Sequence, residues 1–364
     1  MRTLLTCILL ALLGLVAYLL AWPVPVDPQA WQPPVDRGHA DEHALNHRLA
    51  RLELLDIAGT QGPEAVAVDA DGRLYAATEH GHIVRLQADG GGAERWADTG
   101  GRPLGMAFAD DGTLLVADAV LGLLAVTTDG SLRVLADSAD GIAFGLADDV
   151  DVAADGRVYF TDASHRFPWK RFGEDAARFA ILEHGGDGRV LEYDPASGDT
   201  SVLVDGLQFA NGIAVGHDQT YLLVTETARY RVLKVWLSGA RRGQFEVLID
   251  NLPGFPDNIT RGADGRYWLA LFSPRLPLLD RLAGYPFLRK IVVRIPRFLQ
   301  PQPNAHGHVM ALDSRGRVLA DLQDPTGAYP MTTSALEFDG MLYVGSLVAP
   351  ALARLSLDGI IDQR

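Results

Sequence analysis

The sequence predicts an all-β protein, a six-bladed β-propeller behind an N-terminal transmembrane helix. Two observations lead to this prediction. A short pattern, Asp-Gly followed by an aliphatic or aromatic run, recurs along the chain, and hairpins that recur every ~40–50 residues are typical of propellers. A single long apolar run without a charge, residues 4–21, stands near the start of the chain.

The repeated pattern marks one hairpin for each blade. It occurs as DADGRLYAAT, ADDGTLLVADA, AADGRVYFTDA, GADGRYWLALF and FDGMLYVGSL, and GHDQTYLLVTE is a sixth copy without the glycine. The turn positions are Gly72, Gly112, Gly156, Gln219, Gly265 and Gly340. Their intervals are 40, 44, 63, 46 and 75 residues, so the two longest hold insertions, at 165–184 and 273–303. The long alternating helices of a TIM barrel or doubly wound fold are missing.

The first 50 residues divide into an anchor and a linker. Residues 4–21, LLTCILLALLGLVAYLLA, are long enough to approach a bilayer span, and Trp22 follows as an interfacial anchor. Arg2 precedes the run and Asp27 is the first charge after it, which favours an N-terminus inside and a propeller on the extracytoplasmic side. A cleaved signal peptide is the alternative. The sequence thus predicts a membrane anchor over 1–22, a Pro-rich linker over 23–50 and the propeller over 51–364.

Composition excludes several classes of function. The formal net charge of −14 argues against a nucleic-acid partner, since phosphate groups would be repelled. Cys7 is the single cysteine, so the chain has no internal disulfide and no cysteine-based zinc site. The GxSxG and HExxH motifs of serine hydrolases and zinc proteases do not occur.

Polar residues recur at one place in the repeat. Eight residues before the turn positions stand Glu64, Leu104, Asp148, Asn211, Asp257 and Thr332. In a propeller these positions open the innermost strand of each blade, so they converge at one end of the central channel. Four of the six are carboxylates or an amide, the ligands that calcium prefers. We therefore expect a Ca²⁺ site, or a site for another divalent cation. The alternative is that these four residues cap their turns independently of one another.

The same segments resemble a known family. VYFTDAS (158–164), FANGIAV (209–215), PGFPDNI (253–259) and EFDGMLYVGSL (337–347) are similar to the strictosidine-synthase-like branch of the six-bladed propellers, which includes the adipocyte plasma-membrane-associated proteins. Wider relatives are the SMP-30/gluconolactonase and paraoxonase families. The resemblance spans residues 61–357 and implies a divalent cation in the channel. Its ligands would be Glu64, Asp148, Asn211 and Asp257, with Asn258 beside them.

Two positions depart from the family pattern. The relatives usually have Asn where this chain has Asp148, so the site carries one more negative charge. The catalytic glutamate of strictosidine synthase falls at Thr333, where no carboxylate stands, which argues against an amine–aldehyde condensation. Glu337 is four residues further on, where a solvated cap is the expected role.

The resemblance and the oxygen donors together point to metal-dependent hydrolysis of a lactone or aryl ester. Asp257, or Asp149 beside Asp148, is the candidate general base, and His165 is a further candidate at the channel mouth. A non-enzymatic propeller with a structural metal is the main alternative.

Other features give weaker signals. His80 and His82, and likewise His306 and His308, form His-Gly-His tripeptides without a clear third ligand. The insertion 273–303 is basic and amphipathic, so it is either a lid over the channel or a membrane-surface segment that would admit a lipophilic substrate.

Overall fold

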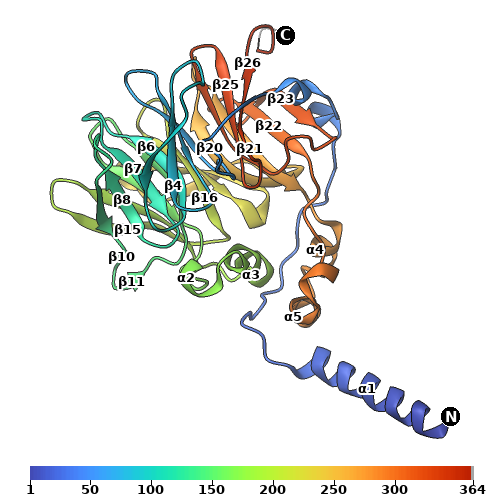
Figure 1. Cartoon of the computed structure of the whole chain (residues 1–364). Helices are drawn as coiled ribbons and strands as arrows, with labels where there is room; N and C mark the ends of the chain where they lie inside the picture. The colour runs from blue at the N-terminus through green and yellow to red at the C-terminus, as the bar shows by residue number, and fades with distance from the viewer. Residues whose placement is uncertain (362–364) are drawn as a thin grey trace.

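Six four-stranded antiparallel sheets are arranged around a central axis (Figure 1). The computed structural model describes residues 1–361, so the last three residues of the predicted 51–364 domain lie outside the described residues. Five sheets consist of strands that are consecutive along the chain. In the sixth, β1 (Glu53–Leu55) joins three strands from the end of the chain, and Leu55 pairs with Leu352. This pairing closes the ring, and the predicted six-bladed propeller is confirmed.

The blades follow one another in chain order, each from the channel outward. Blade one contains β2 (Val66–Val68), β3 (Leu74–Ala77), β4 (His82–Leu86) and β5 (Glu94–Asp98). Blade two contains β6 (Pro103–Phe108), β7 (Leu114–Asp118), β8 (Gly122–Val126) and β9 (Leu132–Ala136). Blade three contains β12 (Ala147–Val152), β13 (Val158–Asp162), β14 (Gly188–Asp194) and β15 (Asp199–Leu207).

Blade four contains β16 (Ala210–Val215), β17 (Tyr221–Glu226), β18 (Arg231–Trp236) and β19 (Phe245–Ile249). Blade five contains β20 (Gly254–Arg261), β21 (Tyr267–Pro274), β22 (Gly307–Leu312) and β23 (Val318–Asp324). Blade six contains β24 (Thr332–Phe338), β25 (Met341–Ser346), β26 (Leu352–Ser356) and β1. A small hairpin, β10 (Ser138–Ala139) and β11 (Ile142–Ala143), precedes blade three.

The hydrophobic core lies between neighbouring blades. Leu115 of blade two packs in one cluster with Phe160 of blade three, and Tyr159 of blade three packs in the next cluster with Ile213 of blade four. Strand residues alternate between the two faces of a sheet, so each blade contributes side chains to two such layers. This packing fixes the register of each inner strand, and therefore the residues that face the channel.

The two insertions fold into short helices. α2 (Trp169–Phe172) and α3 (Asp175–Glu183) connect β13 to β14, and α4 (Pro277–Leu282) and α5 (Pro286–Arg294) connect β21 to β22. A short 3₁₀ turn, Arg297–Leu299, follows α5, and two others, Thr227–Arg229 and Gly239–Arg241, lie between strands of blade four. All four helices lie on the face of the propeller toward the N-terminal helix (Figure 1).

Residues 23–50, the N-terminal strap, run along the propeller instead of forming a free spacer. The strap contains the 3₁₀ turns Asp41–His43 and Arg48–Arg51, the second of which reaches into the propeller domain by one residue. Val26 and Leu49 are buried against the domain. Arg275 and Arg289, expected at a solvent or membrane surface, are instead buried and donate to strap carbonyls at Pro34 and Gln29. These guanidinium groups supply hydrogen bonds to strap carbonyls that have no partner strand, and so hold the strap against the propeller.

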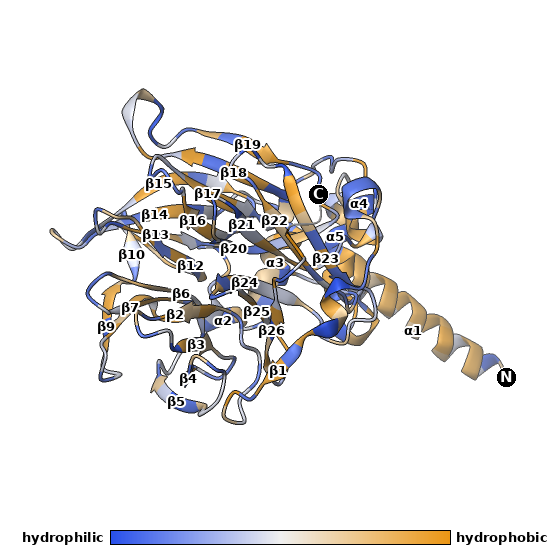
Figure 2. Cartoon of the chain, turned by 90° about the horizontal axis from the view of Figure 1, so that it is seen from above, coloured by the Kyte–Doolittle hydropathy of each residue, from blue (hydrophilic) through white to orange (hydrophobic). Residues whose placement is uncertain are grey.

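The first helix, α1 (Arg2–Ala21), projects from the domain and is apolar along its length (Figure 2). It has the length and composition of a membrane span, which a signal sequence near the N-terminus also has. Its end contacts α5, where Arg294 donates to the carbonyls of Trp22 (2.6 Å) and Leu19 (2.9 Å). The four-helix face of the propeller therefore lies next to the end of this apolar helix.

Candidate active site in the propeller channel

A pocket of about 540 Å³ opens at the end of the channel that faces the helices. Its floor is formed by the inner strands, and its walls and roof come from both insertions. The channel residues are Glu64, Leu104, Asp148, Asn211, Asp257 and Thr333, and the helices add, among others, Trp169, Ile181, Leu276, Leu279 and Val292. The expectation that the insertions cover the channel is met. The result is a polar floor beneath an apolar roof.

The floor confirms the convergence of the repeat positions, with one shift of register. In blades one to five, the residue eight before the turn lines the pocket. In blade six the lining residue is Thr333, not Thr332. The turn of this blade is shorter, because Phe338 and Met341 pair across two residues, whereas Val68 and Leu74 of blade one pair across five. The shorter turn moves the channel-facing position closer to the turn in sequence. Thr332 instead contacts the carbonyls of Leu271 and His308.

Several buried oxygen atoms of the floor lack a hydrogen-bond partner among the described residues. These are Glu64 Oε2, Asn211 Oδ1 and Asn258 Oδ1. Asn258 does not line the pocket, but its amide nitrogen lies 3.2 Å from Glu64 Oε1 and so orients that carboxylate. Unsatisfied buried acceptors are costly, and carboxylate and amide oxygens together suit a hard cation. The donor set fits the cation that the fold family implies.

The electrostatics of the floor lead to the same conclusion. Burial raises the pKa of Glu64 and Asp148 well above the usual range, and the charge of Asp257 raises both further. Burial likewise raises the pKa of Asp257 to about 8, although a hydrogen bond with Asn211 opposes the shift. Three ionised carboxylates together with the Arg102 guanidinium have a net charge of −2. A divalent cation would neutralise this charge and allow all three carboxylates to stay ionised.

Arg102 is a candidate functional residue that the sequence analysis missed. It lines the pocket beside Glu64, is 3% exposed, and its Nε and Nη1 have no hydrogen-bond partner in residues 1–361. Burial lowers its pKa, but an arginine stays protonated under ordinary conditions. Arg102 stands two residues before the repeat position Leu104, in the GRPLGM segment, so a count at the repeat position alone misses it.

Two residues considered for catalysis do not line the pocket. Asp149 follows Asp148 on β12 and points to the opposite face, where Oδ2 accepts from the Ile213 N–H of blade four at 2.8 Å. His165 lies beyond the end of β13, where its N–H donates to the Asp187 carbonyl. Glu337 is also remote and binds Arg266 at 2.7 Å and Trp268 Nε1 at 2.7 Å, as a buried cap.

A second group of potential metal ligands lies outside the channel. Two sets of three donor atoms, from His39, His306 and His308 and from His43, His308 and Asp321, lie within 4.8 Å of one another among the described residues. The third ligand missing from the His306-Gly-His308 motif is thus supplied by the strap or by β23. This His/Asp cluster is partly buried and has the composition of a metal site. The carboxylates of the channel floor are farther apart than these donor atoms, as expected for charged groups that repel one another.

Comparisons with known proteins agree with this architecture. The strictosidine synthase family matches residues 148–240, and the strictosidine synthase-like N-terminal family matches residues 41–86. An adipocyte plasma membrane-associated protein from Danio rerio is 34% identical, covering 98% of this chain and 90% of its own. Strictosidine synthase-like protein 6 from Arabidopsis thaliana is 36% identical, covering 86% of this chain and 84% of its own.

Solved structures show the same fold at low sequence identity. A gluconolactonase from Xanthomonas campestris superposes with a TM-score of 0.61 at 17% identity, covering 92% of this chain and 99% of its own. The calcium-binding protein regucalcin from Agrobacterium tumefaciens superposes with a TM-score of 0.58, also at 17% identity, covering 85% and 94%. These likenesses show the fold. Because the sequence relatives match nearly the whole propeller at 34–36% identity, this chain belongs to the strictosidine synthase-like family that includes the adipocyte plasma membrane-associated proteins.

Proposed function

We propose that this protein is a membrane-anchored hydrolase of lipophilic lactones or aryl esters that depends on a divalent cation, Ca²⁺ in the first instance. The observation that carries the proposal is the channel floor, where Glu64, Asp148 and Asp257 converge with unsatisfied amide oxygens beneath an apolar pocket. The lactonase fold of the solved relatives is consistent with this activity but does not establish it.

Each floor residue has a role in the proposed reaction. Glu64, Asp148, Asn211 and Asp257 would hold the cation. A bound divalent cation supplies Lewis acidity toward a carbonyl oxygen. The unpaired N–H groups of Arg102 would donate to the same oxygen as negative charge develops on it. Asp257, kept ionised by the cation, is the candidate base for the attacking water through its second carboxylate oxygen.

The pocket roof indicates the class of substrate. Its helical wall is formed mainly by leucine, isoleucine and valine side chains, and the nearby helices expose Tyr285, Phe287 and Phe298. These helices contact the end of α1 through Arg294. With α1 in a bilayer, the pocket mouth would face the membrane surface, and a substrate with an apolar tail could enter from there. In this proposal the propeller lies on the extracytoplasmic side, the orientation that the charge asymmetry around α1 favours.

A substrate panel tests the proposal directly. The full chain in detergent is assayed with lactones and aryl esters of increasing acyl length, with Ca²⁺ and with a chelator. We expect hydrolysis that requires the metal and improves with chain length. Absence of hydrolysis across the panel, together with calcium-dependent stability, would instead indicate a binding protein with a structural ion. Condensation of an amine with an aldehyde is not expected, because Thr333 supplies no carboxylate.

A further inference from the structure

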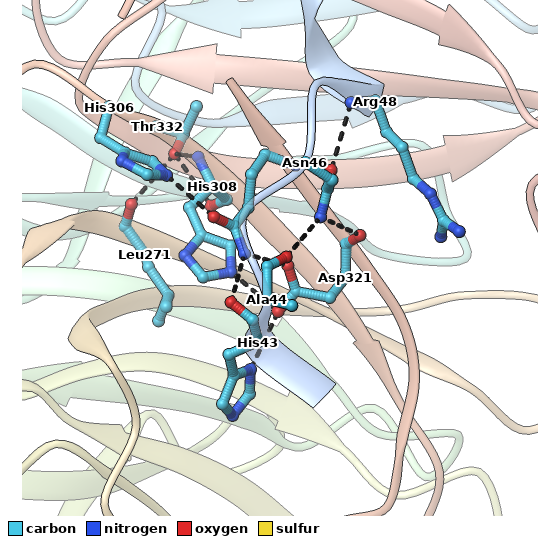
Figure 3. Close-up of polar contacts among 10 residues, drawn as sticks. His43, Ala44, Asn46, Arg48, Leu271, His306, His308, Asp321 and Thr332 are labelled. Carbon is cyan, nitrogen blue, oxygen red and sulfur yellow. Dashed lines mark hydrogen bonds and ion pairs between the residues drawn. The ribbon is translucent and has the colours of Figure 1, made fainter. Parts of the chain in front are cut away.

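The junction between the N-terminal strap and blade five holds four histidines and a carboxylate. His39 and His43 belong to the strap, His306 immediately precedes β22, His308 lies on β22, and Asp321 lies on β23. Figure 3 shows His43 and His308 against Asp321, with His306 on the other side of His308. His43 and Asp321 are 278 positions apart in the sequence. The cluster therefore joins the segment that leaves the apolar helix to the outer half of one blade.

Hydrogen bonds determine which ring nitrogens are protonated. Gln323 Nε2 donates to Asp321 Oδ1 (2.6 Å) and to the His43 carbonyl (3.0 Å), so Gln323 Oε1 must act as an acceptor. His306 Nε2, 3.2 Å from Oε1, therefore carries the proton. His308 Nε2 lies 3.0 Å from Asp321 Oδ2 and donates to it by the same reasoning. In the neutral rings, Nδ1 of both histidines is left with a free lone pair.

His39 completes a set of three imidazoles. Its ring stacks on His306 with centroids 4.9 Å apart, and its buried Nδ1 has no hydrogen-bond partner within residues 1–361. One nitrogen from each of His39, His306 and His308 lies within 4.8 Å of the other two. Each neutral imidazole offers one ring nitrogen with a lone pair, so the three rings can share one metal ion.

We propose that His39, His306 and His308 bind one Zn²⁺-like transition-metal ion that fastens the strap to blade five. Neutral imidazole is a preferred ligand for zinc, whereas calcium selects oxygen donors. Asp321 accepts a hydrogen bond from His308 Nε2, and Gln323 accepts one from His306 Nε2. Hydrogen bonds of this kind orient metal-binding histidines in proteins. Asp321 also bonds His43 Nδ1 at 2.9 Å, which secures the strap on both sides of the ion.

This site differs from the channel site in ligands, place and role. It is separate from the pocket, since none of its residues lines the pocket described above. Its ion would stabilise the docked strap, because a metal that needs ligands from both parts binds only when they are together. The orientation of the propeller relative to α1 would then depend on zinc. The inference does not rest on the proposed hydrolase function.

The test is zinc titration of the metal-free full chain in detergent. We expect one equivalent to bind, with calcium in hundredfold excess failing to compete. The variant H306Q/H308Q should lose affinity at least about 100-fold, and H39Q about 10- to 100-fold. The matched control is H80Q/H82Q, since His80-Gly-His82 is the same tripeptide on another blade, and it should bind zinc like wild type.

Limited trypsin digestion provides the second measurement. Arg37 is exposed and lies two residues before His39. Zinc should slow cleavage after Arg37 in wild type and in the control, but not in H39Q, which alters no strand and should fold normally. The proposal is overturned if the full chain binds no zinc, or if H39Q binds zinc and is protected like wild type. Binding that depends on His306 and His308 but not on His39 would also overturn it, since the strap would then take no part.

Discussion

The channel floor and the N-terminal strap are built in opposite ways. The floor takes one residue from the same register position of successive blades, so Glu64, Asp148 and Asp257 meet because the repeat brings them together. The strap has no repeat, and its contacts join single residues to distant ones, as Arg289 joins Gln29 and His43 joins Asp321. A repeated site is specified many times by the fold, whereas the strap depends on a few individual contacts.

The chemistry of the two regions differs accordingly. The floor offers oxygen donors and a net negative charge, and the strap junction offers neutral nitrogen donors with one carboxylate. A hard cation suits the first region and a borderline transition metal the second. Changes in the floor should therefore affect chemistry and the stability of the whole ring, while changes in the strap should affect local docking.

The largest effect is expected from Asp257→Asn. This change keeps the shape of the side chain but removes a ligand charge and the candidate base. We expect kcat for an aryl ester to fall 10²- to 10³-fold, about 3–4 kcal/mol in activation free energy, with the fold retained. Steady-state kinetics at saturating Ca²⁺ measures the change. Asp149→Asn is the matched control, because Asp149 lies on the face of β12 that points away from the pocket, and an equal loss of kcat there would contradict the assignment.

The next effect concerns the stability of the ring. At a calcium concentration of 100 Kd, the ion should add about 2.7 kcal/mol to the free energy of unfolding. Glu64→Gln should lower the melting temperature in calcium, because the ion binds more weakly. In a chelator the same variant should melt at or above the wild-type temperature, since it removes one of three repelling carboxylates. Melting curves that do not change with calcium or chelator would contradict a cation site in the floor.

The contrast between the two regions explains which parts of the structure can be predicted from the sequence and which cannot. Five Asp-Gly hairpins and one Asp-Gln hairpin are local signals, so the fold and the floor residues Glu64, Asp148, Asn211 and Asp257 follow from counting back from each turn. Arg102 stands one residue before the strand and escapes such a count. The partners of His306 and His308 are missed for another reason, since His39 lies far away in a proline-rich segment without periodicity. Sequence repeats thus predict repeated contacts, and the single contacts of the strap need the structure.

A smaller effect is expected at His184, where the strap rests on α3. Trp31 stacks on the His184 ring at 4.1 Å, and burial, with Arg229, Arg289 and Arg231 nearby, lowers the pKa of His184 to about 3. The unfolded chain, with a pKa near 6.5, then binds more protons between pH 3 and 6.5. The contribution of His184 to the free energy of unfolding is fully present above pH 6.5. It decreases as the pH falls, and about 2 kcal/mol is lost at pH 5.

The variant His184→Asn separates this contribution from the rest of the molecule. Residue 184 has a φ of 55°, a left-handed conformation that asparagine tolerates, so the backbone should be kept. Urea unfolding at pH 7 and pH 5 should show a shallower pH dependence in the variant. An unchanged dependence would mean that the strap is released before His184 is protonated.

The smallest effect on global stability is expected from Trp31→Ala. Trp31 is half-buried, and its ring contacts His184 and Tyr230 at the edge of the core cluster between blades four and five. Its backbone N–H still donates to the Ala283 carbonyl after the substitution. We expect the free energy of unfolding to fall by only about 1 kcal/mol, while trypsin cleavage at Arg37 becomes several-fold faster because the strap opens locally. If instead the whole propeller is destabilised as strongly as by loss of calcium, the strap is part of the core and the distinction between the two regions fails.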